Sequence, residues 1–234
     1  MEPRLLILET SGRGGFVAAA QGPRLLDVRR LDETRRHARD LEPAAADLIQ
    51  RVGWQPRDIQ AVAVGKGPGS YTGLRVGVMA AKAFAYATGC ALVAVETFAA
   101  IARQAPPEAL RLDVVADAQQ DRIYRQSFTR PAPGGALAAA SVLAIGPAAD
   151  WINALEPGTW VTGPGLRGVR NRLPAECGVV VASAWDPQPG SVLASAIDRM
   201  ARGERDDVWS LEPLYLRPSS AEEKWDSRTS APPP

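Results

Sequence analysis

Short apolar runs and amphipathic stretches alternate along this chain, and the period of each indicates a strand or a helix. The runs Arg4–Glu9, Gly15–Ala20 and Arg24–Arg30 are separated by glycine- and proline-containing turns, which predicts a three-stranded meander. From Arg35 to Val52 apolar residues recur every three or four positions, and Gly53 follows as a helix stop. This segment is therefore predicted to be an amphipathic helix.

The rest of the first half alternates strands and helices. Its predicted elements are a buried strand, a long helix, a second strand and a short helix, at Ile59–Val64, Thr72–Thr88, Ala91–Val95 and Thr97–Gln104. Pro106 and Pro107 then interrupt the pattern, so we place a subdomain boundary there and assign residues 1–105 to the first subdomain.

After this boundary the same order of elements begins again. The predicted strands are Leu112–Ala116, Ile123–Thr129, Ala136–Ile145, Thr159–Thr162 and Gly178–Val181, and the predicted helices are Pro147–Leu155, Leu166–Arg172 and Val192–Arg202. Strands followed by alternating helices and strands in each half predict an α/β protein with a second subdomain at 106–216. The halves share no clear residue repeat, so the duplication is inferred from element order alone. The polar stretch 217–234 is expected to be a flexible tail.

Charge and cysteine content narrow the classes of function. The 234 residues include 27 Lys+Arg and 26 Asp+Glu, a net charge of +1, whereas a protein that binds nucleic acid alone usually carries a basic excess. Two cysteines, Cys90 and Cys177, are too few for a disulfide framework or a structural zinc site, which fits a reducing cytoplasm. We expect no signal peptide, because the start, MEPRLLILETSG, lacks the succession of charged, long apolar and small residues. We expect no membrane span, because the longest apolar segment is interrupted by Lys82 and Gly89.

The most distinctive stretch, GKGPGSYTGLR, lies between a predicted strand and a predicted helix. Its candidate residues are Gly65, Lys66, Gly67, Pro68, Gly69, Ser70, Thr72, Gly73 and Arg75. Glycines before a helix start suit an anion, and Lys66 and Arg75 add positive charge. The spacing, however, matches neither a P-loop nor a dinucleotide fingerprint. We favour the alternative in which Ser70 or Thr72 caps the helix and the glycines shape the turn.

Both long helices of the first half carry broad apolar stripes. The helix Thr72–Thr88 is charged only at Arg75 and Lys82, so it is expected to be buried on more than one side, within the chain or against a partner. Two such helices in one subdomain favour an interface. The residues that we assign to this candidate partner interface are Ala38, Leu41, Ala45, Leu48, Gly73, Val76, Gly77, Ala80, Ala81 and Phe84.

Candidate catalytic residues are few. His37 is the single histidine, so a metal site with two histidines is excluded, and no nucleophile elbow supports a hydrolase. Glu9 and Asp117 each end the first strand of a half, where paired carboxylates would hold the magnesium of a nucleotide in an actin-like ATPase or phosphotransferase. Against this alternative, Asp117 is followed by AQQD rather than by a glycine-rich hairpin.

Several segments together resemble the bacterial TsaB (YeaZ) family. They are LLILETS, HARDLEPAAADLI, AVAVGKGPGSYTGLRVGVMAAKAFA, VAVETFAAIA, DAQQDRIYRQSF and PLYLRP, and the resemblance extends from about Leu5 to Pro218. It implies an actin/Hsp70-like ATPase (ribonuclease H-like) fold in two subdomains. It also implies a non-catalytic scaffold subunit of the machinery that forms N6-threonylcarbamoyladenosine in tRNA next to the anticodon.

The resemblance further implies a set of partners. The two N-terminal helices would pack against the catalytic paralogue TsaD, a TsaE-like ATPase would complete the complex, and tRNA would be reached indirectly through it. ATP and metal are expected only on partner subunits, and His37 with Leu41 lacks the His-x-x-x-His pair of TsaD. We expect a homodimer when the chain is alone, because its apolar face is then unpartnered. A metal-dependent protease, an activity with which the wider family has been labelled, is a further alternative that the single histidine opposes.

Three positions depart from the family pattern. Glu9 replaces the common Asp, and Gln119 and Gln120 replace basic residues. These departures weaken a nucleotide-binding role and leave the two interface helices unaffected.

Overall fold

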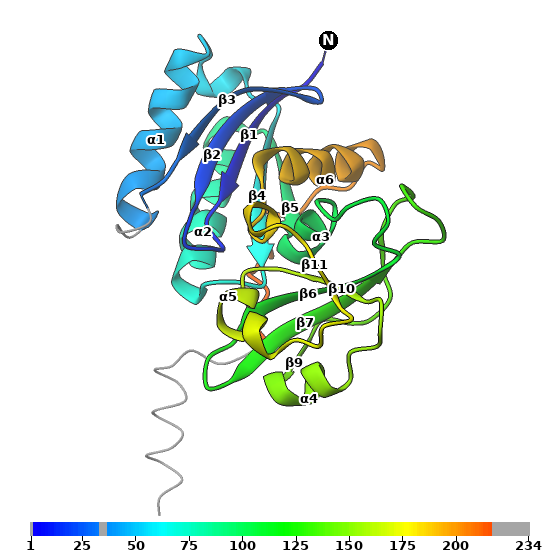
Figure 1. The fold of residues 1–234 in the computed structure, drawn as a ribbon. Coiled ribbons are helices and arrows are strands. Elements are labelled where there is room, and N and C mark those ends of the chain that lie inside the picture. The colour runs from blue at the N-terminus through cyan, green and yellow to red at the C-terminus, as the bar shows by residue number, and fades with distance from the viewer. Residues whose placement is uncertain (1, 33–36, 217–234) are drawn as a thin grey trace, which may run out of the picture.

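The computed structural model describes residues 2–32 and 37–216, which are built around two sheets (Figure 1). The first sheet has the order β3-β2-β1-β4-β5. Its strands are β1 (Arg4–Glu9), β2 (Phe16–Gln21), β3 (Arg24–Arg30), β4 (Ala61–Gly67) and β5 (Ala91–Glu96). The first three strands are antiparallel neighbours, as the predicted meander requires, whereas β4 is parallel to both β1 and β5.

Helices cover both faces of the first sheet. On one face lie α1 (His37–Arg51) and α2 (Tyr71–Thr88), and on the other lie α3 (Thr97–Ala102) and α6 (Pro189–Ala201) (Figure 1). A short 3-10 turn, η1 (Pro56–Asp58), precedes β4. Because successive strand residues point to opposite faces, Leu6 and Leu8 pack with α1 and α2 while Leu5 and Ile7 pack with α6.

The second sheet has the order β11-β10-β6-β7-β8, with β9 also paired to β7. Its strands are β6 (Arg111–Asp117), β7 (Arg122–Thr129), β8 (Ala138–Ala139), β9 (Ala144–Pro147), β10 (Trp160–Thr162) and β11 (Gly178–Val179). Helices α4 (Ala148–Asn153) and α5 (Leu166–Val169) and the turns η2 (Arg170–Arg172) and η3 (Ala182–Ala184) belong to the same half. Phe98 and Ile101 of α3 are buried against this sheet, so α3 joins the two halves.

The structure refines two expectations. The predicted strand Ala136–Ile145 is two short strands, β8 and β9, which pair with different parts of β7. Helix α6 comes late in the chain, yet Val192, Leu193 and Ala196 pack on the first sheet.

The subdomain limits 1–105 and 106–216 stay predictions, and 217–234 lies outside the described residues. Within the described ranges, no helix is long and apolar enough to cross a membrane.

The segment after α6 returns to the first sheet and follows α2. We call residues 206–216 the C-terminal strap. It begins where the Asp206 amide donates to the carbonyl of Leu92 (2.8 Å) and ends beyond Leu214, whose amide donates to the carbonyl of Lys66 (2.8 Å). Between these points, Lys82 Nζ donates to the carbonyls of Trp209 (3.3 Å) and Leu211 (3.0 Å). The strap therefore fixes one flank of α2.

Candidate partner interface and adjoining cleft

The inner face of α2 lies unusually close to the end of β1. A Cβ atom on Gly73 would be 2.1 Å from the carbonyl oxygen of Thr10, and one on Gly77 would be 2.3 Å from Thr10 Oγ1. Thr10 Oγ1 donates a 2.7 Å hydrogen bond to the carbonyl of Gly73. These two glycines are therefore required by the approach of α2 to the backbone of its own chain.

The glycine-rich loop connects β4 to α2 and has the capping role that we favoured. Ser70 Oγ accepts a hydrogen bond from the Gly73 amide (3.3 Å), and the Ser70 amide donates to the carbonyl of Ser11 (2.7 Å). Thr72 is exposed. Gly67, at a φ of 113°, adopts a conformation that favours glycine and precedes a cis bond to Pro68.

The two cations of this loop make separate contacts. Lys66 pairs with Glu96 (3.3 Å), whereas Arg75 donates to the hydroxyl of Tyr71 (3.3 Å). Neither lines the cleft beside the loop. The pair of positive charges that would make the loop a phosphate site is therefore not assembled in this structure.

Half of the residues assigned to the partner interface are packed inside the chain. Leu41, Leu48 and Ala81 are at most 2% exposed, and Gly73 and Gly77 are buried against β1. Four others are partly buried at the margin of the same core: Ala45, Val76, Ala80 and Phe84. The side chain of Ala38 lies outside the described residues. A docking face on these helices therefore has to use the four partly buried residues together with exposed residues that were not assigned to the interface.

Further residues suited to a docking face form an apolar stripe on the outer side of α2. At 3.6 residues per turn, Val76, Met79, Ala80, Ala83 and Ala87 share one side of the helix, and the charged residues Arg75 and Lys82 lie along one edge of it. Met79 is 62% exposed, whereas a core-facing position such as Val78 is 1% exposed. We call these five residues the outer apolar stripe. Met79, Ala83 and Ala87 were not among the predicted interface residues, although they continue the spacing set by Val76 and Ala80.

Two aromatic pairs join α2 to the C-terminal strap at either end of this stripe. Tyr86 meets Trp209 edge to face, with ring centroids 5.5 Å apart, and both side chains are exposed. Tyr71 stacks on Tyr215 at 4.6 Å. The sequence pattern gives no sign of these contacts, because the partners are far apart in the chain.

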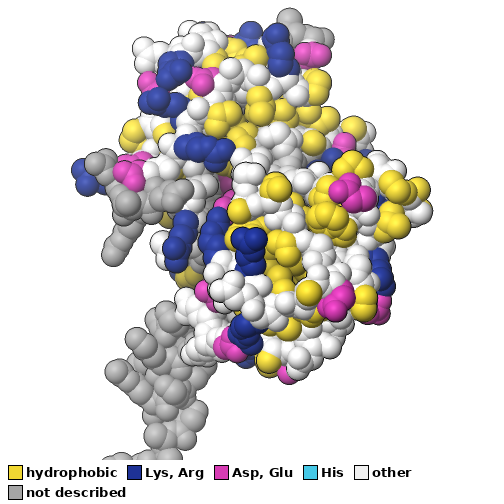
Figure 2. All heavy atoms as spheres, in the orientation of Figure 1, with side chains coloured by type: hydrophobic (Ala, Val, Ile, Leu, Met, Phe, Trp, Pro, Cys, Tyr) yellow, Lys and Arg dark blue, Asp and Glu magenta, His cyan; other side chains and the backbone are white. Residues whose placement is uncertain are grey.

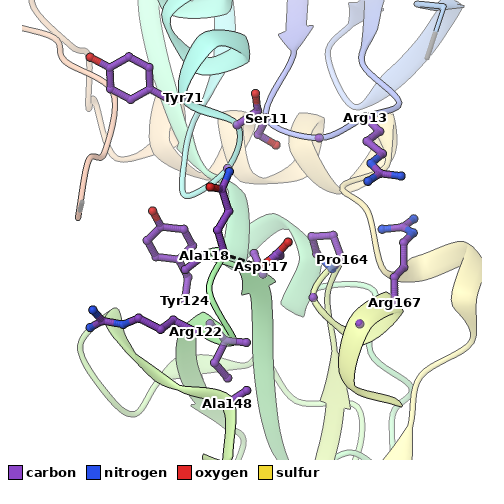
Figure 3. A pocket seen from close by; sticks show the side chains of 18 of the residues that line it. Ser11, Arg13, Tyr71, Asp117, Ala118, Arg122, Tyr124, Ala148, Pro164 and Arg167 are labelled. Carbon is purple, nitrogen blue, oxygen red and sulfur yellow. Dashed lines mark hydrogen bonds between the residues drawn. The ribbon is translucent and has the colours of Figure 1, made fainter. Parts of the chain in front are cut away.

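A cleft of about 1200 Å³ separates the two halves next to the glycine-rich loop (Figure 3). Asp117 lines it, and its Oδ1 accepts a hydrogen bond from the Gln119 amide (2.7 Å). Glu9 does not line the cleft: it is 1% exposed, and its Oε1 accepts from the Ser11 amide (2.6 Å). The two carboxylates of the actin-like alternative are therefore not both presented to the cleft. In the described part of the chain, no group of three His, Cys, Asp or Glu side chains could hold a metal ion.

The turn between β6 and β7, which we call the second hairpin, has a strained backbone. Gln119, Gln120 and Asp121 have φ values of 63°, 55° and 55°, a region that residues other than glycine rarely adopt. The turn is closed by the Ala118 amide, which donates to the carbonyl of Arg122 (2.9 Å). Arg172 donates to Asp121 (2.6 Å), and this hydrogen bond lowers the pKa of the Asp121 carboxyl. These side chains occupy the place where an open, glycine-rich hairpin would admit phosphates.

Comparisons with known proteins lead to proteins of tRNA threonylcarbamoyladenosine formation. Residues 32–149 match TsaD, the family described as tRNA N6-adenosine threonylcarbamoyltransferase. The TsaB protein of Escherichia coli is 28% identical over 197 residues, which is 81% of this chain and 84% of that protein. TsaB of Bacillus subtilis is 26% identical over 190 residues, covering 78% of this chain and 80% of that protein.

A solved structure of the same family has a similar fold. YeaZ from Pseudomonas aeruginosa superposes with a TM-score of 0.77 at 28% identity, covering 92% of this chain and all of that one. This likeness confirms the predicted actin/Hsp70-like α/β fold. The chain therefore belongs to the TsaB (YeaZ) family of tRNA threonylcarbamoyladenosine biosynthesis proteins.

Proposed function

We propose that this chain is a non-catalytic subunit of the cytoplasmic machinery that forms N6-threonylcarbamoyladenosine in tRNA, and that it docks a TsaD-like catalytic subunit through α2. Membership of the TsaB family supports the pathway. The observation that carries the docking proposal is the outer apolar stripe, an uncharged surface on a helix whose opposite face is already packed.

The physical case for docking rests on what this surface would gain. Burying an exposed methionine or valine side chain contributes about 1.5–3 kcal/mol. Ala80, Ala83 and Ala87 are small, so a partner helix can approach α2 closely and Met79 can project beside it. Ala45 of α1 lies at the margin of the same core, which places α1 beside α2 at this surface.

The chemistry is assigned to partners in this proposal. Glu9 is sealed from the cleft, and the side chains of the second hairpin occupy the opposite wall. ATP and metal would then be held by the TsaD-like subunit and a TsaE-like ATPase, and this chain would support the active arrangement.

The test is co-expression with the TsaD-like subunit of the same organism, followed by size-exclusion chromatography. We expect a heterodimer with the wild-type chain and none with Ala83→Arg, because a buried unpaired guanidinium opposes docking. The matched control is Ala201→Arg, at an exposed position at the end of α6, which should leave the heterodimer intact. An Ala83→Arg chain that is folded and still forms the heterodimer would refute the docking face.

The same variant tests the proposed homodimer. If the free chain pairs through the outer apolar stripe, light scattering should report a dimer for the wild type and a monomer for Ala83→Arg. A dimer that survives the substitution would place self-association on another surface.

A further inference from the structure

Five exposed arginines lie in or beside the lining of the cleft. Arg13 lies in the β1–β2 hairpin and Arg122 begins β7, while Arg167, Arg170 and Arg172 belong to α5 and η2. Figure 3 shows Arg13 and Arg167 reaching toward one another from opposite walls. Lysine and arginine side chains also gather near this junction in Figure 2. We call these five residues the arginine rim.

The rim concentrates positive charge in a chain that is otherwise balanced. The cleft lining itself is balanced, because three aspartates, Asp117, Asp121 and Asp186, accompany the three rim arginines that line it. Arg170 and Arg172, outside the lining, add two positive charges, against one negative charge from Asp150 of the adjoining α4. The whole chain carries a net charge of only +1. Local charge of this kind attracts polyanions even where the overall charge does not.

The arginines of the rim are available to a ligand. Within the described ranges, Arg13 and Arg122 form no ion pair. Arg172 pairs with Asp121 (2.6 Å) and Arg167 pairs with Asp186. Exposed pairs of this kind contribute at most about 1 kcal/mol, so a phosphate can share or displace them.

Two of the arginines lie near a buried aromatic ring. Arg167 and Arg170 each lie 6.0 Å from the ring centroid of Trp185. Trp185 is 6% exposed, and its Nε1 donates to the carbonyl of Val180 (2.7 Å), which fixes the ring. A cation at this distance is attracted by the face of the indole ring, and the planar donor fork of a guanidinium group fits phosphate oxygens.

We propose that the arginine rim contacts the phosphate backbone of the tRNA that the complex modifies. This inference rests on the proposed function, which supplies RNA as the polyanion. An extended ligand fits better than a small anion, because the cleft lining holds as many aspartates as arginines, whereas Arg170 and Arg172 lie outside it. A small anion inside the cleft would meet carboxylates as well as arginines, but an RNA backbone crossing the mouth would also reach the two outer arginines.

The test is a fluorescence anisotropy titration of the heterodimer with a labelled transcript of a tRNA that carries this modification. The rim variant combines R13Q, R122Q and R170Q, none of which breaks an ion pair within the described residues. The control variant combines R24Q, R57Q and R205Q, which removes the same charge from exposed positions elsewhere.

The logarithm of the affinity falls linearly with the logarithm of the salt concentration, and each lost phosphate contact makes this slope shallower by about 0.7–0.9. Raising salt from about 50 to 200 mM should therefore weaken wild-type binding more than rim-variant binding, by a factor of about 20–40 for three contacts. The control variant should keep the wild-type slope. Equal slopes and affinities for wild type and rim variant would overturn the proposal. The proposal would also be overturned by a rim variant that binds tRNA as the wild type does and loses only the binding of inorganic tripolyphosphate.

Heterodimer formation is measured first, by size-exclusion chromatography. If the wild-type chain forms no heterodimer, the docking proposal is refuted. The RNA contact is then tested by the same titration on the chain alone. There, weaker binding by the rim variant than by the control supports the contact, and equal binding overturns it.

Discussion

Replacing Gly77 with alanine tests the close approach of α2 to β1. The added Cβ would lie 2.3 Å from Thr10 Oγ1, whereas the next atoms, Thr10 Cβ and Val64 Cγ2, are at 3.5 and 3.6 Å. The conflict is therefore with one hydroxyl group. In an exposed helix the same change would stabilise the protein by about 1 kcal/mol, because alanine has the higher helix propensity.

The destabilising terms are expected to exceed this gain. To accept the methyl group, Thr10 must rotate or α2 must move, and either change breaks the 2.7 Å hydrogen bond from Thr10 Oγ1 to the Gly73 carbonyl. Overpacking costs about 1–3 kcal/mol, and the lost hydrogen bond about 1 kcal/mol. We expect Gly77→Ala to lower the free energy of unfolding by about 1–3 kcal/mol, which corresponds to a Tm lower by roughly 3–10 °C.

A double-mutant cycle isolates the contact. Thr10→Ala removes the hydroxyl, so Gly77→Ala should be neutral or stabilising in that background, which gives a coupling of about 1–3 kcal/mol in urea denaturation followed by circular dichroism. Gly190→Ala in α6 is the control, because nothing lies within 4 Å of its added Cβ. Additivity of the Gly77 and Thr10 substitutions to within about 0.5 kcal/mol would refute the reasoning.

Two further predictions concern the second hairpin and the segment after α6. Gln120→Gly should raise the free energy of unfolding by about 1 kcal/mol in urea denaturation, because glycine relieves the strain at a φ of 55°. The matched Gln126→Gly in β7 should lower it, and stabilisation by both would contradict this account. Hydrogen bonds from Arg202 and Arg199 lower the pKa of Glu204 to about 2 from 4.5. A lowered folded-state pKa contributes stability that is present above pH 4.5 and is lost as the pH falls toward 2. Glu204→Gln should therefore flatten the dependence of Tm on pH in that window, and an unchanged acid profile would show that the ion pairs do not contribute.

The order of elements could be predicted from the sequence, because the helical and strand periods are local properties. Strands β1 to β7 and helices α1 to α3 lie close to the predicted segments. The position of α6 could not be predicted, because its apolar stripe fits either sheet, and only the folded chain shows it against Leu5 and Ile7. The C-terminal strap could not be predicted either, because its contacts join residues that are far apart in the chain.

The candidate interface shows a second limit. Small residues on α2 correctly indicate close backbone approach, but the pattern does not say which backbone approaches. Gly73 and Gly77 meet Thr10 of the same chain rather than a partner. Because α2 is apolar nearly all round, its spacing groups Met79 with Val76 and Ala80 but does not say whether that side faces the core or the solvent. The structure shows Met79 exposed.

The C-terminal strap also has a consequence for solubility. Strand β5 is the last strand of the first sheet, and an unpaired sheet edge is a template for aggregation. Asp206 covers this edge: its amide donates to Leu92, and its carboxylate accepts from the Ala94 amide (2.6 Å). The carbonyl of Ala94 accepts from Arg199 of α6. The edge made by residues 91–96 thus stays open during synthesis until residue 206 has emerged, and a chain shortened before that residue would expose a strand able to add another.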